Sequence, residues 1–547
     1  MPRKISKCEK WPENVDPHPG SVTRSYEIEV ITPIFGGGTE AGVNDPVTLI
    51  RPSSIRGHLR FWWRATRGAN CASVSELRQR EGEIWGTTDN PSPVCIEVEV
   101  EKHDDSLECA SYKWDKRMHH GKGGYRLIWS EPFWYMFKWH DIPGKDNGKL
   151  LESLIQQFDV KWVKNAKIEK IDADKTIKIS AEKHILSLRI NDRRTELIAE
   201  IDGVKANKRF NVRMEDHELN VYAQNSSLPY VLFPFQGKAP DSNEPKDPSK
   251  MVKSARFKLI VQISSPDGKN IEKDVEAAIW AWVNFGGIGA RSRRGCGTLY
   301  CIGSTPQDSN LTPSNLQNFD EWLKGRISHY ELVKLSTFRD WPTLGKFYLS
   351  DKDSTNPIYC WEECICVLKD LRQGVNLGRD PGPGRSRWPE PESVRNIAMK
   401  QKGLGTRPHN WHSPDPRMPD IAFPRAEFGM PIIIEIRGEG LKHTLQHSED
   451  HDRMASPLIL RPMKFSNGSF ASMIIRLNTP PLGPAYLKPD KKDRVIGYHI
   501  PAPEIVDPNR SSAFPESPRH KFCTAGCSAL DAFVLFAQSR GFVEVIP

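Results

Sequence analysis

The segment Arg51–Ala69 reads RPSSIRGHLRFWWRATRGA and combines a helix start signal with five arginines. Pro52, Ser53 and Ser54 supply the N-cap signal. The residues that follow recur at the spacing i, i+4, i+7, i+8 and i+11, which places them on one side of a helix. They are Ile55, Leu59, Trp62, Trp63 and Thr66. The pattern predicts an amphipathic helix that packs by this face.

The arginines of this segment lie on a neighbouring face of the predicted helix. Arg56, Arg60 and Arg64 are spaced i, i+4 and i+8, so their guanidinium groups recur at roughly 6 Å along the axis, comparable to the phosphate spacing of an extended RNA strand. An ordinary solvated face normally mixes acids with arginines, yet this segment has no acid. Guanidinium forks suit bidentate phosphate contacts. The predicted RNA-binding residues are Arg51, Arg56, His58, Arg60, Arg64 and Arg67.

A second basic segment, FGGIGARSRRGCGTL, runs from Phe285 to Leu299 and holds five glycines among three arginines. Glycine lets the backbone approach a ligand closely, while arginine supplies charge. The segment follows a predicted helix and opens a predicted strand, the reverse of a dinucleotide or P-loop site. A merely flexible turn is the alternative. With the glycine run that ends the first strand, the predicted contacts are Gly36, Gly37, Gly38, Gly286, Gly287, Gly289, Arg291, Arg293 and Arg294.

The first 305 residues are predicted to contain one strand-helix-strand unit near their beginning and another near their end. This arrangement suits a split βαβ fold. The expected elements are strands Tyr26–Thr32, Val94–Val100, Phe257–Ile263 and Thr298–Ile302, the helix after Arg51, and helices Ser73–Ile84 and Asp274–Asn284. Residues 101–221 form a β-rich insertion with hairpins Lys167–Ser180 and His184–Ile201.

The second half follows a polar linker, 306–330, and forms a second domain, 331–547. The expected elements of this half are helices Phe319–Arg326, which lies within the linker range, Trp361–Arg372 and Ser528–Ser539, and strands Pro431–Ile436, Pro457–Leu460 and Ala471–Leu477. Residues 374–419 hold eight prolines and six glycines, which predicts a long loop. Arg385, Arg387 and Arg395 in this loop form a third candidate RNA contact, together with Trp388, which either stacks on a base or anchors the loop.

The bulk composition indicates a globular chain in a reducing compartment. Hydrophobic residues make up 38% and charged residues 27%, and the net charge is +8. The sequence has no run of 18 apolar residues and no signal peptide, so we expect a cytoplasmic protein without membrane contact.

Neither the cysteines nor the histidines predict a cofactor or a metal. The eleven cysteines lack paired zinc-finger spacing and read as reduced thiols, with a metal site as the alternative. His443, His447 and His451 would form a metal face on a helix, but the polar segment between strands favours an exposed loop or short helix.

Three segments together, ITPIFGGG, LIRPSSIRGHLRFWWRATRG and NFGGIGARSRRGCGTL, are more specific than any one of them. They closely resemble the RAMP superfamily of CRISPR proteins, in particular the first-subunit family of the type III-B Cmr complex. GRSRWPEPESVR, FPRAEFGMPIII and RMASPLILRP resemble the long bacterial form. The motifs cover roughly 26–86, 222–302 and 374–462. Cys296 departs from the aromatic residue usual in these loops, and the insertion 101–221 has no counterpart in the resemblance.

The resemblance implies an α+β fold of tandem ferredoxin-like (RRM-like) domains, residues 1–305 and 331–547, with a large β-rich insertion in the first and long loops in the second. It implies a place at the 3′ end of the guide CRISPR RNA, where the subunit helps capture complementary target single-stranded RNA beside other Cmr subunits. Target cutting belongs to a different subunit in this family, so we expect a non-catalytic protein.

Two other functions stay open. His58 lies among the arginines and could act as the general base of a metal-independent endoribonuclease. Asp45 could be a cleaving group, although Asn-Asp-Pro is first a turn signal. The third hypothesis is a protein–protein scaffold whose arginines meet acidic partner surfaces without touching RNA.

Overall fold

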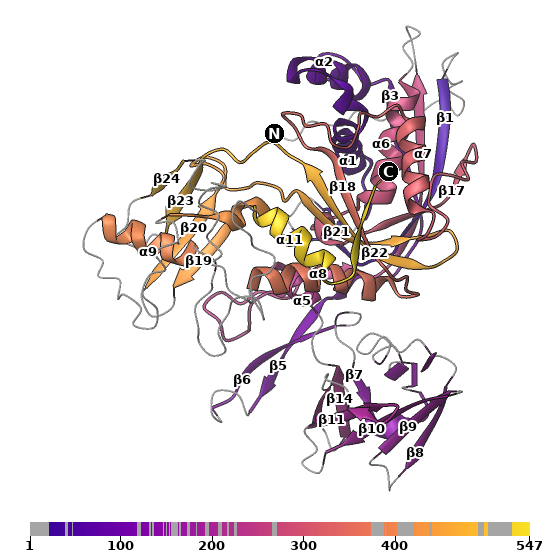
Figure 1. Ribbon diagram of the computed structural model, residues 1–547, viewed down its shortest axis with the longest axis vertical. Coiled ribbons are helices and arrows are strands. Elements are labelled where there is room, and N and C mark those ends of the chain that lie inside the picture. Colours follow the sequence, from indigo (N-terminus) through magenta and orange to yellow (C-terminus); the bar gives the residue numbers. More distant parts are fainter. Residues whose placement is uncertain are drawn as a thin grey trace, which may run out of the picture.

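Two antiparallel four-stranded sheets organise the chain in the computed structural model (Figure 1). The structure describes residues 21–546 apart from 39–41, 46–47, 117–121, short stretches within 131–226, 265–270, 374–387, 389, 402–420, 437–439, 491–496 and 502–527. Among the described residues, no helix is both long and apolar enough to cross a membrane.

The first sheet has the strand order β17-β1-β16-β3. Its strands are β1 (Ser21–Val30), β3 (Val94–His103), β16 (Ala255–Ser264) and β17 (Leu299–Thr305). Helix α1 (Pro52–Ala65) connects β1 to β3, followed by α2 (Val74–Trp85), and α6 (Glu272–Phe285) connects β16 to β17. These elements confirm the strand and helix predictions for this half to within a few residues.

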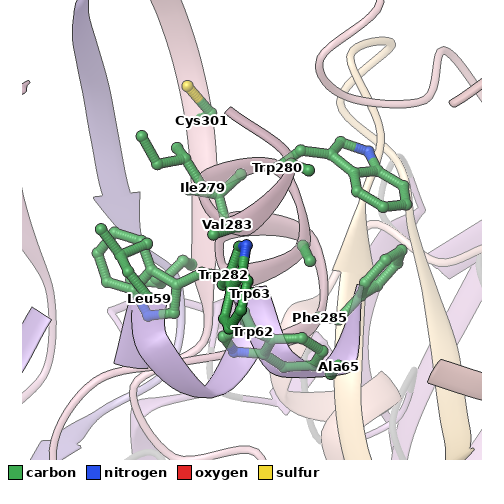
Figure 2. Close-up of a cluster of buried hydrophobic side chains, with 14 of the residues drawn as sticks. Leu59, Trp62, Trp63, Ala65, Ile279, Trp280, Trp282, Val283, Phe285 and Cys301 are labelled. Atoms are coloured by element: carbon green, nitrogen blue, oxygen red, sulfur yellow. The ribbon is translucent and has the colours of Figure 1, made fainter. Parts of the chain in front are cut away.

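Helix α1 packs against α6 through the apolar face that its sequence predicts (Figure 2). Ile55, Leu59, Trp62 and Trp63 are all buried. Burial of such side chains contributes roughly 1.5–3 kcal/mol each. The predicted serine cap is wrong, because Pro52 is already the first helical residue and the helix has no side-chain cap.

The second sheet, ordered β21-β22-β18-β25, repeats the first in element sequence and strand order. Its elements are β18 (Thr343–Ser350), α8 (Pro357–Gln373), β21 (Leu458–Lys464), β22 (Phe470–Asn478), α11 (Ala529–Gln538) and β25 (Phe542–Val545). Helix α7 (Phe319–His329) precedes it, and its Phe319 and Leu323 belong to a buried cluster to which both sheets contribute.

The insertion folds around a core of its own. Its main sheet runs β7-β14-β13-β11-β10-β9-β8 among the described residues, and buried side chains such as Ile179 and Leu188 fill one face. Both predicted hairpins are confirmed. The strands are β7 (Met136–Lys138), β8 (Lys167–Ile171), β9 (Thr176–Ala181), β10 (His184–Ile190), β11 (Glu196–Ile201), β12 (Val204–Lys205), β13 (Phe210–Glu215) and β14 (Glu218–Ala223), beside the hairpin β5 (Ala110–Asp115) and β6 (Gly124–Trp129).

A side sheet of the second half contains β19 (Ile432–Ile436), β20 (Leu441–Gln446), β23 (Ala485–Pro489) and β24 (Tyr498–Ile500). Helix α9 (Glu390–Lys400) contacts β19. The prediction of a loop throughout 374–419 is therefore wrong for the residues of α9. A small sheet joins β2 (Ile34–Phe35), β15 (Lys250–Val252) and β4 (Leu107–Glu108) near helix α5 (Leu228–Leu232).

Candidate nucleic-acid interface

The arginine face of α1 meets a carboxylate from the next helix. Glu81 lies on the buried side of α2, and its side chain is only 8% exposed. Its Oε1 accepts hydrogen bonds from Arg60 Nε and from Arg64, each at 2.7 Å. The prediction that the arginine face is free of acids is therefore wrong, because Glu81 reaches it from the next helix. One buried acid partly neutralises two arginines that are still 41% and 35% exposed.

Arg56 and Arg67 are held more firmly within the fold. The Arg56 guanidinium donates to the carbonyl of Val94 at 2.8 Å. Arg67 donates to the carbonyl of Tyr330 and to the carboxylate of Glu331, both at 3.0 Å. These bonds tie α1 to β3, and the turn that follows α1 to the end of α7.

A cavity of about 840 Å³ opens between α1, α2 and the turn that follows α2. Arg56, Arg60 and Arg78 line it together with a single carboxylate, Glu81, which leaves an excess of two positive charges. The side chain of Arg78 is exposed and has no partner among the described residues. Hydroxyl and amide groups of Thr87, Thr88, Asn90 and Ser92 complete the lining. Such a cavity suits a phosphate-bearing ligand.

The two predicted glycine segments come together in space. The Ala290 amide donates to the Phe35 carbonyl at 2.6 Å, and the Gly297 amide donates to the Pro33 carbonyl at 2.9 Å. Gly289 has φ of +74°, and a Cβ there would lie 2.6 Å from the Phe35 carbonyl oxygen. Glycine is therefore required for this close approach. Arg51 joins the same region by donating to the Gly38 carbonyl at 3.0 Å.

The arginines of the second glycine segment divide into two kinds. Arg294 donates to the carbonyls of Leu458 and Phe428, and Arg293 donates to the carbonyl of Ser456. Burial lowers the pKa of Arg294 to about 9, with the nearby charges of Arg372 and Arg291 adding to the shift. Both residues thus hold the loop against the second half of the chain. The exposed Arg291 has no side-chain partner among the described residues.

His58 and Asp45, the candidate catalytic groups, sit in ordinary structural settings. The half-buried ring of His58 stacks on Trp282 at 6.4 Å between centroids, and burial lowers its pKa to about 4. Asp45 Oδ1 accepts from the Thr48 amide at 2.9 Å, a turn contact of the kind that the Asn-Asp-Pro sequence favours.

The third candidate segment is described only in part. Arg385 and Arg387 lie outside the described residues. Trp388 is 3% exposed and donates to the Leu371 carbonyl at 3.3 Å, and Arg395 is also buried. The geometry fits the alternative in which Trp388 anchors its loop.

The histidine prediction needs a correction at one position. His443 lies within strand β20 and is buried, whereas His447 and His451 are exposed. The three histidines therefore do not share an exposed loop or short helix. No group of three His, Cys, Asp or Glu side chains among the described residues is placed to hold a metal ion.

Sequence reasoning missed Glu81 and Arg78 because it treated the arginine segment alone. A signal was present in the next helix, where Glu81 shares a face with Leu77 and Ile84. A carboxylate on an otherwise apolar face needs a cationic partner to be buried. Arg78 lies three residues before Glu81, is exposed, and lines the same cavity.

Comparison with known proteins gives a family match for about half of the chain. The model of the RAMP superfamily matches residues 27–300. The CRISPR system Cmr subunit Cmr1-2 of Pyrococcus furiosus is 30% identical over 115 residues, which make up 20% of this chain and 55% of that subunit. The match thus spans about half the length of this curated relative.

Two solved structures align over most of the chain with low similarity. The apo form of Cmr1 from Pyrococcus furiosus is 13% identical, and the alignment covers 96% of this chain and 98% of that one with a TM-score of 0.37. A chain of the type III-B Cmr-β complex bound to cognate target RNA is 12% identical, with 83% and 94% covered and a TM-score of 0.39.

Proposed function

Because the chain belongs to the RAMP superfamily, we propose that it is a non-catalytic RNA-binding subunit of a type III-B CRISPR Cmr ribonucleoprotein complex. In this role it lies at the 3′ end of the guide CRISPR RNA and helps capture complementary target RNA in the cytoplasm. The similarity to a Cmr1-2 subunit supports the assignment to this complex.

The proposal includes two ferredoxin-like domains, residues 1–305 and 331–547, with 306–330 between them. The same strand order and the same strand-helix-strand-strand-helix-strand sequence in both sheets support it. The insertion 101–221 then falls between the second and third strands of the first domain.

The observation that carries RNA binding is the cavity beside α1. Its arginines outnumber its acids by three to one, and Arg60 and Arg78 remain accessible there. Guanidinium groups bind phosphate irrespective of base, so we infer recognition of the RNA backbone. Pairing between guide and target then supplies the sequence specificity, as in other guide-dependent systems.

Replacement of Arg78 by glutamine tests this site without disturbing the fold, because Arg78 has no partner among the described residues. We expect weaker binding of labelled single-stranded RNA. The log–log salt slope should fall by about 0.7, because the variant neutralises one phosphate fewer. Fluorescence anisotropy across a salt series measures both quantities. The melting temperature is expected to stay unchanged.

Arg189→Gln is the matched control, since Arg189 is also exposed, on strand β10 of the insertion, and its replacement removes the same charge. Equal effects of both variants would mean that only net charge matters, and would reject the cavity. A wild-type chain that binds no RNA at all would favour the scaffold hypothesis instead.

The nuclease hypothesis predicts that His58 is required for RNA cleavage. With a pKa of about 4, its imidazole is neutral near pH 7 but a very weak base there, and it is stacked on Trp282. We therefore expect full-length RNA to persist with the wild type and with His58→Ala alike, as read on denaturing gels. RNA products formed by the wild type and absent with His58→Ala would overturn the non-catalytic assignment.

A further inference from the structure

A second arginine-lined cavity, of about 340 Å³, lies beside the glycine segment Phe285–Leu299. Arg291 and Arg294 reach it from this segment, and Arg372 reaches it from the end of α8. The remaining lining comes from α5 and the residues after it, chiefly Tyr230 and Phe233. Segments far apart in the sequence thus build one site.

The cavity concentrates positive charge without an acid. None of its lining residues is Asp or Glu. Arg294 is fixed by the carbonyls that it binds, and Arg372 faces the Phe428 ring at 5.9 Å with its Nε atom buried and lacking a hydrogen-bond partner. Arg291 is exposed and also lacks a side-chain partner among the described residues. Converging guanidinium groups repel one another, so an anion bound between them would stabilise the arrangement.

Aromatic groups lie beside this charge. Phe233 is 64% exposed, although it follows a helix whose Leu228, Val231 and Leu232 are buried. Tyr230 on the same wall is half-buried. An exposed aromatic ring next to arginines is the arrangement that single-stranded nucleic-acid sites use, with bases on rings and phosphates on cations.

We propose that this cavity binds one nucleotide of a single-stranded RNA, with a phosphate between Arg291 and Arg372 and the base against Phe233. The inference rests on the proposed RNA-binding function and adds a second contact point to it. It also separates the roles of the loop arginines. Arg293 and Arg294 hold the loop, whereas Arg291 contacts the ligand together with Arg372 from α8.

Crosslinking of the full chain to an oligouridylate that carries 4-thiouridine tests the proposal. We expect crosslinks on the peptide that holds Tyr230 and Phe233, identified by mass spectrometry. The double variant Arg291→Gln/Arg372→Gln is expected to lower that crosslink on the order of 100-fold, as removal of two charge-assisted hydrogen bonds to the phosphate implies. Arg189→Gln is expected to leave it unchanged.

The outcomes separate this site from the proposed function. RNA binding that depends on Arg78 but gives no crosslink at Tyr230 or Phe233 would overturn the second site and leave the function standing. A crosslink that the double variant does not weaken would also overturn it. A chain that binds no RNA under any condition would overturn both. The single variant Arg291→Gln, which breaks no contact among the described residues, guards against misfolding of the double variant.

Discussion

Arg461→Ala is expected to lower the free energy of unfolding by about 3–5 kcal/mol, the largest effect of any single change considered. The Arg461 side chain is fully buried in β21 of the second sheet. Its guanidinium donates to the Gly286 carbonyl at 2.6 Å and to the Leu299 carbonyl at 2.8 Å, both in the first half of the chain. Burial lowers its pKa to about 9. Truncation leaves a cavity and removes this donor from three backbone carbonyls, those of Gly286, Leu299 and the neighbouring Pro462.

Urea unfolding measures this destabilisation, and two variants divide it into its causes. Arg461→Met keeps most of the volume, so it is expected to cost less than the alanine change and to report mainly the missing hydrogen bonds. Arg256→Ala is the surface control, because the ion pairs of Arg256 with Glu27 and Glu101 are exposed. It is expected to cost under about 1 kcal/mol. An Arg461→Ala midpoint equal to that of the control would show that the two halves are not held together by this residue.

The contrast between Arg461 and Arg60 shows which features of the structure could be predicted from the sequence and which could not. Helix α1 was predictable because its apolar spacing is local, and its buried face is the predicted one. Which arginines are buried and which stay exposed was not predictable, since this depends on partners distant in sequence. Arg294 binds carbonyls more than 130 positions away. No local pattern distinguishes such an arginine from Arg291, which stays exposed.

Helix α9 and strand β18 were also not predicted from the sequence. Helix α9 was not predicted because the prolines and glycines were counted over the whole range 374–419. The sequence of α9, EPESVRNIAMK, has one proline near its start, where a helix tolerates it. Strand β18 was overlooked although seven of its eight residues are buried. Its apolar run has no alternation, because it lies between β22 and β25 inside the second sheet. A short buried run cannot be assigned by periodicity alone.

Glu81→Gln is expected to tighten RNA binding about tenfold, the opposite direction from every arginine change. Glu81 holds Arg60 and Arg64 through one oxygen atom in the wild type. A glutamine of the same shape keeps an acceptor but removes the charge, so both guanidinium groups become available to phosphate and the cavity becomes more positive. The salt slope should also rise, by about 0.7 for each additional phosphate that the protein neutralises.

The triple variant Arg60→Gln/Arg64→Gln/Glu81→Gln provides the matched comparison, because it removes both arginines without leaving a buried carboxylate unpaired. Relative to Glu81→Gln it should bind RNA on the order of 100-fold more weakly, for two charge-assisted hydrogen bonds to phosphate. Anisotropy at one salt concentration orders the three proteins as Glu81→Gln, wild type, triple variant. Identical affinities of all three proteins would exclude α1 from the RNA contact.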